Sequence, residues 1–327
     1  MKKEEILILL RERNDFVSGQ ELCEKFGVSR TAVWKAINQL KEEGYEISSV
    51  HNKGYCLVAQ KDVLSDVEIK SRLQTERMAW ELVYLTETGS TNNDCKLMAE
   101  QGAKEGLLVV ADRQNSGKGR RGRSWQSPKG TTISMSLLLR PTYETDAAPQ
   151  VTLVMALAMA DAVREVTGLE AKIKWPNDIV VGGKKICGIL TEMSLDMDTI
   201  NYVVIGVGVN VNNDSFEDEI QETATSLKLQ TGNTVSRASL IAVAMKYFEQ
   251  YYEQFSKDLD MKNLKDRYQG YLVSMGKEVR VLDPKGEYVG VCRGINEAGE
   301  LMVELQDGTV TCVYAGEVSV RGLYGYT

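Results

Sequence analysis

The order of apolar and polar positions separates residues 1–60 from the rest of the chain. Apolar residues at helical spacing predict a first helix, and a capping box formed by Ser18 and Glu21 predicts a second helix that ends at Gly27. Ser29 caps a third predicted helix. Two alternating strands, YEISS and GYCLV, then flank the turn HNKG and predict a hairpin. This order is typical of a winged helix-turn-helix domain.

The remainder of the chain predicts two further domains, which makes the protein a multidomain α+β chain. Ser65 and Glu68 predict a short helix, after which β-rich segments such as LLVVAD, TISMSLLLR and NYVVIGVGVNV surround the long apolar helix VTLVMALAMADAVREV. A second long helix is predicted from Ser236. Beyond Gly270, short strands separated by DPKG, EAG and QDG predict a small antiparallel barrel. The predicted domains are 1–62, 63–270 and 271–327.

The charge of the chain changes this picture only when it is counted by segment. The 327 residues include 39 Lys and Arg against 46 Asp and Glu, so the net charge of −7 argues against a nucleic-acid partner. Residues 1–60 are neutral, however, and their predicted third helix and hairpin carry basic and amide side chains. A three-helix domain without a role in DNA binding is the alternative. The candidate DNA-binding residues are Ser29, Arg30, Thr31, Lys35, Asn38 and Lys53.

Cysteine and histidine usage disfavours a zinc site. The 6 cysteines lie far apart without a CxxC pair, and His51 is the single histidine. Scattered thiols are typical of a cytoplasmic protein with reduced cysteines. The N-terminus is a short apolar stretch between charges without a cleavage site, and no run of 18 apolar residues occurs. We therefore expect a cytoplasmic protein without a membrane partner.

A basic, glycine-rich segment at 113–129 is the densest chemical signal. Gly117, Gly119 and Gly122 match G-x-G-x-x-G, but the residues that follow predict a turn and a strand instead of the helix that a dinucleotide fold requires. A Walker A loop is excluded because Asp112 stands where its first glycine belongs. The segment suits a bound triphosphate, with a solvated basic loop as the alternative. The residues that would neutralise the phosphates are Lys118, Arg120, Arg121 and Arg123.

Two strand ends predict further polar groups near an anion. KWPND ends one strand and places Asn177 and Asp178 in a turn, where a carboxylate and an amide could hold Mg²⁺ or simply form the turn. The glycine pair of VGGKK then leads Lys184 and Lys185 into a strand. Because side chains alternate along a strand, only one of these lysines can point inward.

Glycines and a helix start complete the candidate site. In VVIGVGVNVN, Gly206 and Gly208 stand where side chains would block the approach of a ligand, and Asn210 ends the strand. The segment Ser90, Thr91 and Asn92 opens a predicted helix, whose free N–H groups could meet a polar ligand. Ordinary helix capping is the alternative there.

Taken together, GKGRRGRSW, KWPND, KKICGIL, IGVGVN and the STN helix start resemble the biotin–protein ligases that are also biotin operon repressors. The resemblance covers essentially the whole chain, and four motifs in register make it specific. Many members of that family have arginine where this chain has Lys118, which keeps the charge but loses the bidentate fork.

The resemblance implies a fold and two activities. The central domain would be similar to class II aminoacyl-tRNA synthetases, and the C-terminal barrel would be SH3-like. The enzyme would condense biotin with ATP, with Mg²⁺, to biotinyl-5′-AMP and then transfer biotin to a lysine of a biotin carboxyl carrier domain. Such chemistry needs positioning and charge neutralisation, and no covalent nucleophile. The adenylate-bound form would be a homodimer that binds operator DNA.

The family pattern also implies roles for individual residues. Arg120 and Lys185 would be the catalytic residues, and Asp178 would hold Mg²⁺. Alternatives that stay open are a lipoate-type ligase, a biotin-sensing repressor without catalysis, and a ligase whose N-terminal domain has lost DNA binding. Biotin would contact Ser90, Thr91, Asn92, Gln114, Lys118, Gly119, Arg120 and Lys185, and ATP would contact Arg121, Arg123, Trp125, Asn177, Asp178 and Asn210.

Overall fold

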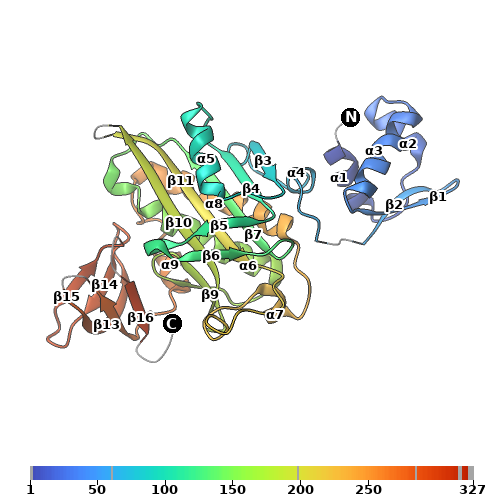
Figure 1. Cartoon of the computed structure of the whole chain (residues 1–327). Helices are drawn as coiled ribbons and strands as arrows, with labels where there is room; N and C mark the ends of the chain where they lie inside the picture. The colour runs from blue at the N-terminus through green and yellow to red at the C-terminus, as the bar shows by residue number, and fades with distance from the viewer. Residues whose placement is uncertain (1–2, 60–61, 197–198, 284–285, 316–318, 323–327) are drawn as a thin grey trace. The chain divides into compact units, whose positions relative to one another are not determined.

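A computed structural model describes residues 3–59, 62–196, 199–283, 286–315 and 319–322 (Figure 1). The chain divides into two compact units, each held together by contacts among its own residues. The first consists of Met1–Gln74 and Ser236–Ala242, and the second of Thr75–Val235 and Val243–Thr327. The first unit contains the predicted winged helix, and the second contains the predicted β-rich region with the C-terminal strands.

The first unit confirms the predicted three helices and hairpin. Ser18 Oγ accepts a hydrogen bond from Glu21 N at 3.0 Å, and Ser29 Oγ accepts one from Ala32 N at 3.3 Å, so both predicted caps form. Gly27 ends the second helix with a φ of 63°. The elements are α1 (Lys3–Arg13), α2 (Gly19–Phe26), α3 (Arg30–Glu42), β1 (Glu46–Val50), β2 (Gly54–Ala59), α4 (Asp66–Lys70) and the first turns of α8 (Arg237–Asp258).

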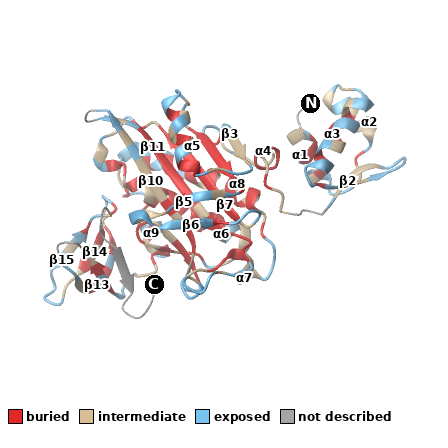
Figure 2. Ribbon diagram, in the orientation of Figure 1, coloured by how far each residue is buried: buried red, intermediate tan, exposed pale blue. Residues whose placement is uncertain are grey.

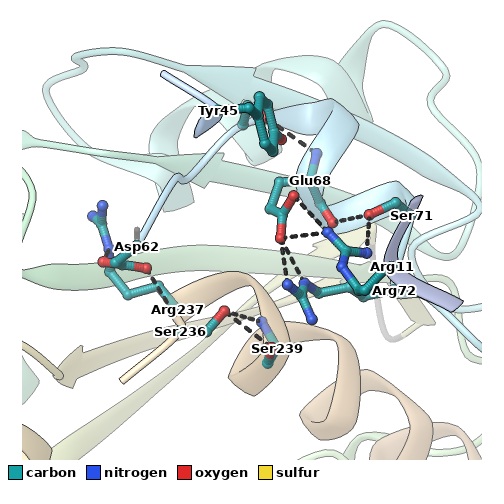
Figure 3. A network of polar contacts seen from close by, with 10 residues as sticks. Arg11, Tyr45, Asp62, Glu68, Ser71, Arg72, Ser236, Arg237 and Ser239 are labelled. Atoms are coloured by element: carbon teal, nitrogen blue, oxygen red, sulfur yellow. Dashed lines mark hydrogen bonds and ion pairs between the residues drawn. The ribbon is translucent and has the colours of Figure 1, made fainter. Parts of the chain in front are cut away.

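Buried ion pairs hold the segment that follows the hairpin (Figure 3). Glu68, only 5% exposed, accepts hydrogen bonds from Arg11 Nη2 at 2.9 and 3.0 Å and from Arg72 Nε at 2.7 Å. Asp62 pairs with Arg237, and the two side chains are 7% and 4% exposed. Removing one partner of such a pair leaves a buried charge, which is strongly destabilising. These pairs therefore fix α4 against α1, and the chain near Asp62 against the start of α8.

A seven-stranded mixed sheet lies at the centre of the second unit. Its strand order is β3-β4-β7-β11-β10-β9-β8; β3 and β4 are parallel, and every other neighbouring pair is antiparallel. The strands are β3 (Glu81–Leu85), β4 (Leu107–Ala111), β7 (Thr132–Leu139), β8 (Lys172–Lys174), β9 (Asp178–Val181), β10 (Lys184–Asp196) and β11 (Thr199–Asn210). Figure 2 shows that the middle of this sheet is buried.

Helices α5 (Thr91–Glu100) and α6 (Gln150–Thr167) cover opposite faces of the sheet. Thr191 of β10 hydrogen-bonds Thr152 of α6, whereas the next residue, Glu192, hydrogen-bonds Asn92 of α5. Adjacent strand residues point to opposite faces, so the two helices lie on different sides. The helical stretch Thr145–Thr167 is long and apolar enough to cross a membrane, but 83% of its 18-residue apolar window is buried inside the protein. It is the core helix that its apolar pattern predicts.

The remaining elements complete the second unit. The C-terminal strands form an antiparallel sheet in the order β15-β14-β13-β12-β16, as the alternating pattern beyond Gly270 predicts. The elements are η2 (Thr145–Ala147), α7 (Leu227–Thr231), α9 (Lys265–Tyr271), β12 (Glu278–Leu282), β13 (Tyr288–Ile295), β14 (Leu301–Glu304), β15 (Val310–Val313) and β16 (Ser319–Gly322).

A buried carboxylate joins the helices behind the sheet. Asp161 of α6 is 5% exposed and accepts hydrogen bonds from Tyr251 of α8, from Tyr271 of α9 and from Arg267 of α9. Burial by itself raises the pKa of this carboxyl group, but the hydrogen bonds from Arg267, Tyr271 and Tyr251 outweigh burial and lower the pKa below its ordinary value. Asp161 therefore stabilises the packing of α8 and α9 in its charged form.

We expect Asp161→Asn to lower the free energy of unfolding at pH 7 by about 1–3 kcal/mol. The substitution replaces a charged hydrogen-bond acceptor by a neutral one, and hydrogen bonds to a neutral group are weaker. A lowered pKa stabilises the fold above the pKa of the unfolded carboxyl, about 3.9, and this stabilisation disappears as pH falls through the folded-state value. The difference between variant and wild type should therefore shrink below about pH 3.9 in denaturant titrations. Glu165→Gln, at a more exposed pair on the same helix, should cost less than about 1 kcal/mol. Equal losses for the two variants would contradict this role of Asp161.

Candidate functional site

The glycine-rich segment forms its own hairpin, a feature that the pattern of side chains did not predict. Strands β5 (Gln114–Lys118) and β6 (Ser124–Ser127) pair antiparallel around the single turn η1 (Arg120–Gly122). A Cβ on Gly117 would lie 2.5 Å from the carbonyl oxygen of Trp125, so this pairing requires glycine there. Backbone pairing of polar strands leaves no apolar period in the sequence, which explains why we expected only a loop. The hairpin gives the basic residues defined positions.

One cavity in the second unit brings together all eight residues predicted to contact biotin. We call it the central cavity. Apolar lining comes from Met135, Ile189, Leu190 and Val207, and glycine backbone comes from Gly188, Gly206 and Gly208. The predicted residues that line it are Ser90, Thr91, Asn92, Gln114, Lys118, Gly119, Arg120 and Lys185, joined by Trp125 and Asn177.

A hydrogen-bond network orders the neutral polar side of the central cavity. Gln114 Oε1 accepts hydrogen bonds from Thr91 N at 2.8 Å and from Thr91 Oγ1 at 3.1 Å. Ser136 Oγ lies 2.8 Å from Thr91 Oγ1 and 2.6 Å from Asn92 Oδ1. Ser90 precedes α5 but makes no capping hydrogen bond with its side chain. Its hydroxyl is thus not used as a helix cap, which removes the main support for the capping alternative.

Glu192 anchors this network and was not a predicted site residue. Its carboxylate accepts hydrogen bonds from Asn92 Nδ2 at 2.7 Å and from Lys96 Nζ at 2.6 Å. Burial raises the pKa of Glu192, and the hydrogen bonds from Lys96 and Asn92 outweigh it, so the pKa lies below its ordinary value. The charged carboxylate therefore holds Asn92 in place. About a hundred residues separate Asn92 from Glu192, and no local pattern links them.

The two glycines of β11 line the central cavity, where we expected a ligand to approach, and they also make room for two protein side chains. A Cβ on Gly206 would lie 2.1 Å from Asn92 Oδ1, and one on Gly208 would lie 2.4 Å from the indole ring of Trp125. Gly206 thus seats Asn92, and Gly208 seats Trp125. The indole N–H of Trp125 is buried without a hydrogen-bond partner in the described part of the chain.

We expect Gly208→Ala to displace Trp125 and to raise the KM of the ligase activity that the family resemblance implies by about 10-fold or more, since a misplaced binding group costs of order 1–2 kcal/mol. Steady-state kinetics at varied biotin and ATP measure this effect. Gly270→Ala is the matched control, because a Cβ there meets nothing within 4 Å and the residue lies inside α9. A KM unchanged by Gly208→Ala would contradict the seating role of Gly208.

Cations line the other side of the central cavity. Lys185 Nζ pairs with Asp178 at 2.6 Å and lies 5.8 Å from the centroid of the Trp125 ring, whereas Lys184 hydrogen-bonds the carbonyl of Gln221. Of the two lysines, only Lys185 lines the central cavity, as alternation predicts. Asp178 is the first residue of β9, which corrects its predicted place in the turn. Asp178 pairs with Gly188 of β10, so β9 begins one residue earlier than we expected.

Arg120 links three parts of the second unit. Its Nη1 donates to Asn177 Oδ1 at 2.9 Å, and its Nη2 donates to the carbonyl of Ala315 in the C-terminal region at 2.8 Å. Burial lowers the pKa of its guanidinium, Asp178 raises it and Arg121 lowers it, and an arginine remains charged throughout. A fixed positive charge therefore stands at the edge of the central cavity.

A second cavity adjoins the central one and shares Trp125 and Lys185 with it. Of the predicted ATP-binding residues, Arg123, Trp125 and Asn210 line this second cavity, and Asn177 lines the central one. Arg121 has a φ of 58°, is exposed and lines neither of the two, and Asp178 also lines neither. Residues of the second cavity that we did not predict include Gln126, Asn213, Ser215 and Phe216. The pair Asn212-Asn213, which follows IGVGVN after one intervening valine, was the available signal for Asn213.

The predicted DNA-binding residues extend from the cap of α3 to its middle and include one residue of the hairpin of the first unit. Arg30, Thr31 and Lys35 are exposed, and Asn38 is half-buried. Lys53 is exposed in the hairpin turn, with its Nζ 5.9 Å from the centroid of the Phe16 ring. The Ser29 hydroxyl caps α3. These positions form one side of the helix and the adjoining hairpin tip.

Comparisons with known proteins agree with this architecture. Residues 83–210 match the model of the Biotin/lipoate A/B protein ligase family, residues 2–56 match an HTH domain, and residues 274–321 match the Biotin protein ligase C terminal domain. Bifunctional ligase/repressor BirA of Bacillus spizizenii is 38% identical over 322 residues, 98% of each chain. The chain belongs to this bifunctional ligase/repressor family. The corresponding protein of Bacillus subtilis is 37% identical over the same share of both chains.

A solved structure of a related ligase supports the fold of the second unit. The biotin protein ligase from Aquifex aeolicus in complex with biotin and ATP is 30% identical, with a TM-score of 0.66. The match covers 74% of this chain and 99% of that one. The bifunctional ligase/repressor family therefore accounts for both units of the present chain.

Proposed function

We propose that the protein is an ATP-dependent biotin–protein ligase and a biotin-responsive repressor. It activates biotin to biotinyl-5′-AMP, transfers biotin to a lysine of a biotin carboxyl carrier domain, and binds operator DNA. One observation carries the ligase function: the eight residues chosen for biotin come from three separate segments of the sequence and line a single cavity. Biotin and ATP also occupy the solved ligase from Aquifex aeolicus.

The lining of the central cavity matches the chemistry of biotin. Gly206 lies beside Asn92, and Gly208 lies beside Trp125, whose ring Lys185 approaches; the two glycines are two strand residues apart, a distance of about 7 Å. The neutral hydrogen-bonding groups around Asn92 and the cation of Lys185 therefore occupy different ends. A cyclic urea suits the neutral end, a thioether ring suits the apolar lining, and a carboxylate suits the end with Lys185 and Arg120.

The cations would favour the first half-reaction, in which biotin and ATP form biotinyl-5′-AMP. The biotin carboxylate oxygen forms a bond to the α-phosphorus of ATP, and the bond to pyrophosphate breaks. Both reactants are anions, so Lys118, Arg120 and Lys185 lower the barrier by neutralising the crowded charge. Arg123, Trp125 and Asn210 bind the nucleotide from the second cavity.

Asp178 is the proposed protein ligand for Mg²⁺. The described residues contain no group of three or more His, Cys, Asp or Glu side chains that could hold a metal ion by themselves. A single carboxylate together with phosphate oxygens is an ordinary way to bind Mg²⁺. Asp178 faces Lys185, which places it beside the proposed phosphate position. When bound, the ion would supply further neutralisation of the phosphates.

A third cavity offers an approach for the acceptor amine. It shares Arg120, Asn177, Ile189 and Leu190 with the central cavity and extends to Tyr314 and Ala315 of the C-terminal region. The second half-reaction needs a deprotonated lysine amine at the acyl carbon of the adenylate, with AMP as the leaving group. We infer that the carrier lysine enters here, because the second cavity is taken by the nucleotide.

A mass measurement tests the ligase function. We expect a biotin carrier domain incubated with the protein, biotin, ATP and Mg²⁺ to gain the mass of one biotinyl group. The carrier without ATP is the control. No mass gain would overturn the ligase function. Biotin-dependent ATP–pyrophosphate exchange would then show which step is missing. A protein that fails only in the transfer would still show exchange, whereas a pure biotin sensor would show none.

The repressor function rests on the first unit and on coupling to the ligase site. We infer that the adenylate-bound protein forms a homodimer that presents two winged helices to a palindromic operator. Ligand can increase DNA affinity only through its differential affinity for two states. We therefore expect tighter operator binding with biotin and ATP than without them; equal affinity at matched salt would exclude the coupling.

The proposed organisation keeps three domains, at 1–62, 63–270 and 271–327. We also propose a cytoplasmic location without a membrane partner. All six cysteines are free thiols, which suits a reducing compartment.

A further inference from the structure

The outward face of α3 carries a large aromatic side chain that its own unit does not bury. Trp34 is 57% exposed. Thr31, Trp34, Lys35 and Asn38 stand at i, i+3, i+4 and i+7, so they share one face of the helix. The opposite face packs into the core through Val33, Ala36, Ile37 and Leu40, which are all buried. Trp34 therefore points away from the core of the first unit.

This face is also cationic. Arg30 begins the helix and lines a groove with His51 and Lys53 of the hairpin, whose tip Figure 2 shows as exposed. Lys35 has no carboxylate partner within the described part of the chain, whereas Glu43, at the far end of α3, pairs with Lys3. An exposed aromatic side chain among cations that no described carboxylate pairs with suits a polyanion with apolar groups on its surface, namely DNA, when it stands on a helix-turn-helix.

We propose that Trp34 reads the operator sequence by packing its indole against the 5-methyl group of a thymine in the major groove. This inference rests on the proposed repressor function. Lysine and arginine contacts to phosphates position a protein without reading sequence. An indole has one donor and no acceptor, so it cannot make the paired hydrogen bonds that distinguish guanine or adenine. Its apolar face matches the thymine methyl, the one apolar group on the base edges of the major groove.

Binding to matched duplexes separates this role from a phosphate contact. A duplex selected from a random library by the full-length protein with biotin and ATP serves as the operator, and its scrambled version serves as the non-specific control. We expect Trp34→Ala to weaken operator binding about 10- to 100-fold and to leave the scrambled duplex and the salt slope unchanged. Lys35→Ala should weaken both duplexes and reduce the salt slope by about one.

Replacing single thymines by uracil then locates the contact, because uracil lacks only the methyl group. For the wild-type protein, we expect one thymine in each half-site whose replacement weakens binding. Trp34→Ala should be insensitive to that replacement, and Trp34→Phe should retain part of the sensitivity. Val58→Ala is the matched control, since Val58 is 63% exposed at the end of the hairpin away from its tip.

The outcomes distinguish this inference from the repressor function. Equal weakening of operator and scrambled duplex by Trp34→Ala, or a uracil pattern identical to that of the wild type, would overturn the assignment of Trp34 alone. If Trp34→Ala changed dimer formation and not DNA binding, the proposed contact with thymine would be overturned, and Trp34 would be assigned to a contact between protein chains. A wild-type protein unable to discriminate the two duplexes would overturn both proposals. Unchanged carrier biotinylation and thermal unfolding would show that the variants fold.

Discussion

Arg120→Ala should release biotinyl-5′-AMP from the enzyme about 10- to 150-fold faster than the wild type. The guanidinium donates to Asn177 and to the carbonyl of Ala315, and it lines both the central and the third cavities. A hydrogen bond to a charged group is worth about 1.5–3 kcal/mol, which corresponds to this range of rates. Radiolabelled adenylate formed on the enzyme, followed by rapid filtration, measures the release.

The matched control for this prediction is Arg113→Ala. Arg113 belongs to the same basic segment, but its side chain is 50% exposed and pairs only loosely with Glu87, at 3.8 Å. We expect its variant to release adenylate at the wild-type rate. Release from Arg120→Ala at the wild-type rate would show that Arg120 does not retain the adenylate, and faster release from both variants would indicate an effect of net charge instead.

Lys185→Gln should lower the rate of adenylate formation by about 10²- to 10³-fold, the usual effect of removing one preorganised group that stabilises developing charge. Lys185 Nζ lies beside Asp178 and the Trp125 ring, between the central and the second cavities. Glutamine keeps the length and polarity of the side chain but removes the positive charge. Biotin-dependent ATP–pyrophosphate exchange measures this half-reaction without the carrier.

Lys184→Gln is the internal control, because its side chain turns to the other side of β10 and hydrogen-bonds the carbonyl of Gln221. It should retain exchange activity within about twofold, as surface substitutions cost less than about 0.5 kcal/mol. Comparable losses in the two lysine variants would contradict the assignment, since only Lys185 lines the central cavity.

Local elements were predictable because they depend on residues close in sequence. The caps of Ser18, Ser29 and Ser65 each form, with the hydroxyl accepting from the amide three residues later. The alternation that allows one inward lysine also holds, because a strand has a period of two wherever it lies. The motif residues assembled for biotin were predictable only through the family resemblance, which supplied the long-range information.

Sequence alone determined most helices and strands, the order of the domains along the chain and the residue types of the site, because capping, periodicity and turn chemistry act over a few residues. Only the tertiary structure decided that Glu192 holds Asn92, that Gly206 and Gly208 seat Asn92 and Trp125, and that Arg120 reaches Ala315. These contacts join strands and loops that lie far apart in sequence. Burial and close packing select them, and both depend on the whole folded unit instead of on neighbouring residues.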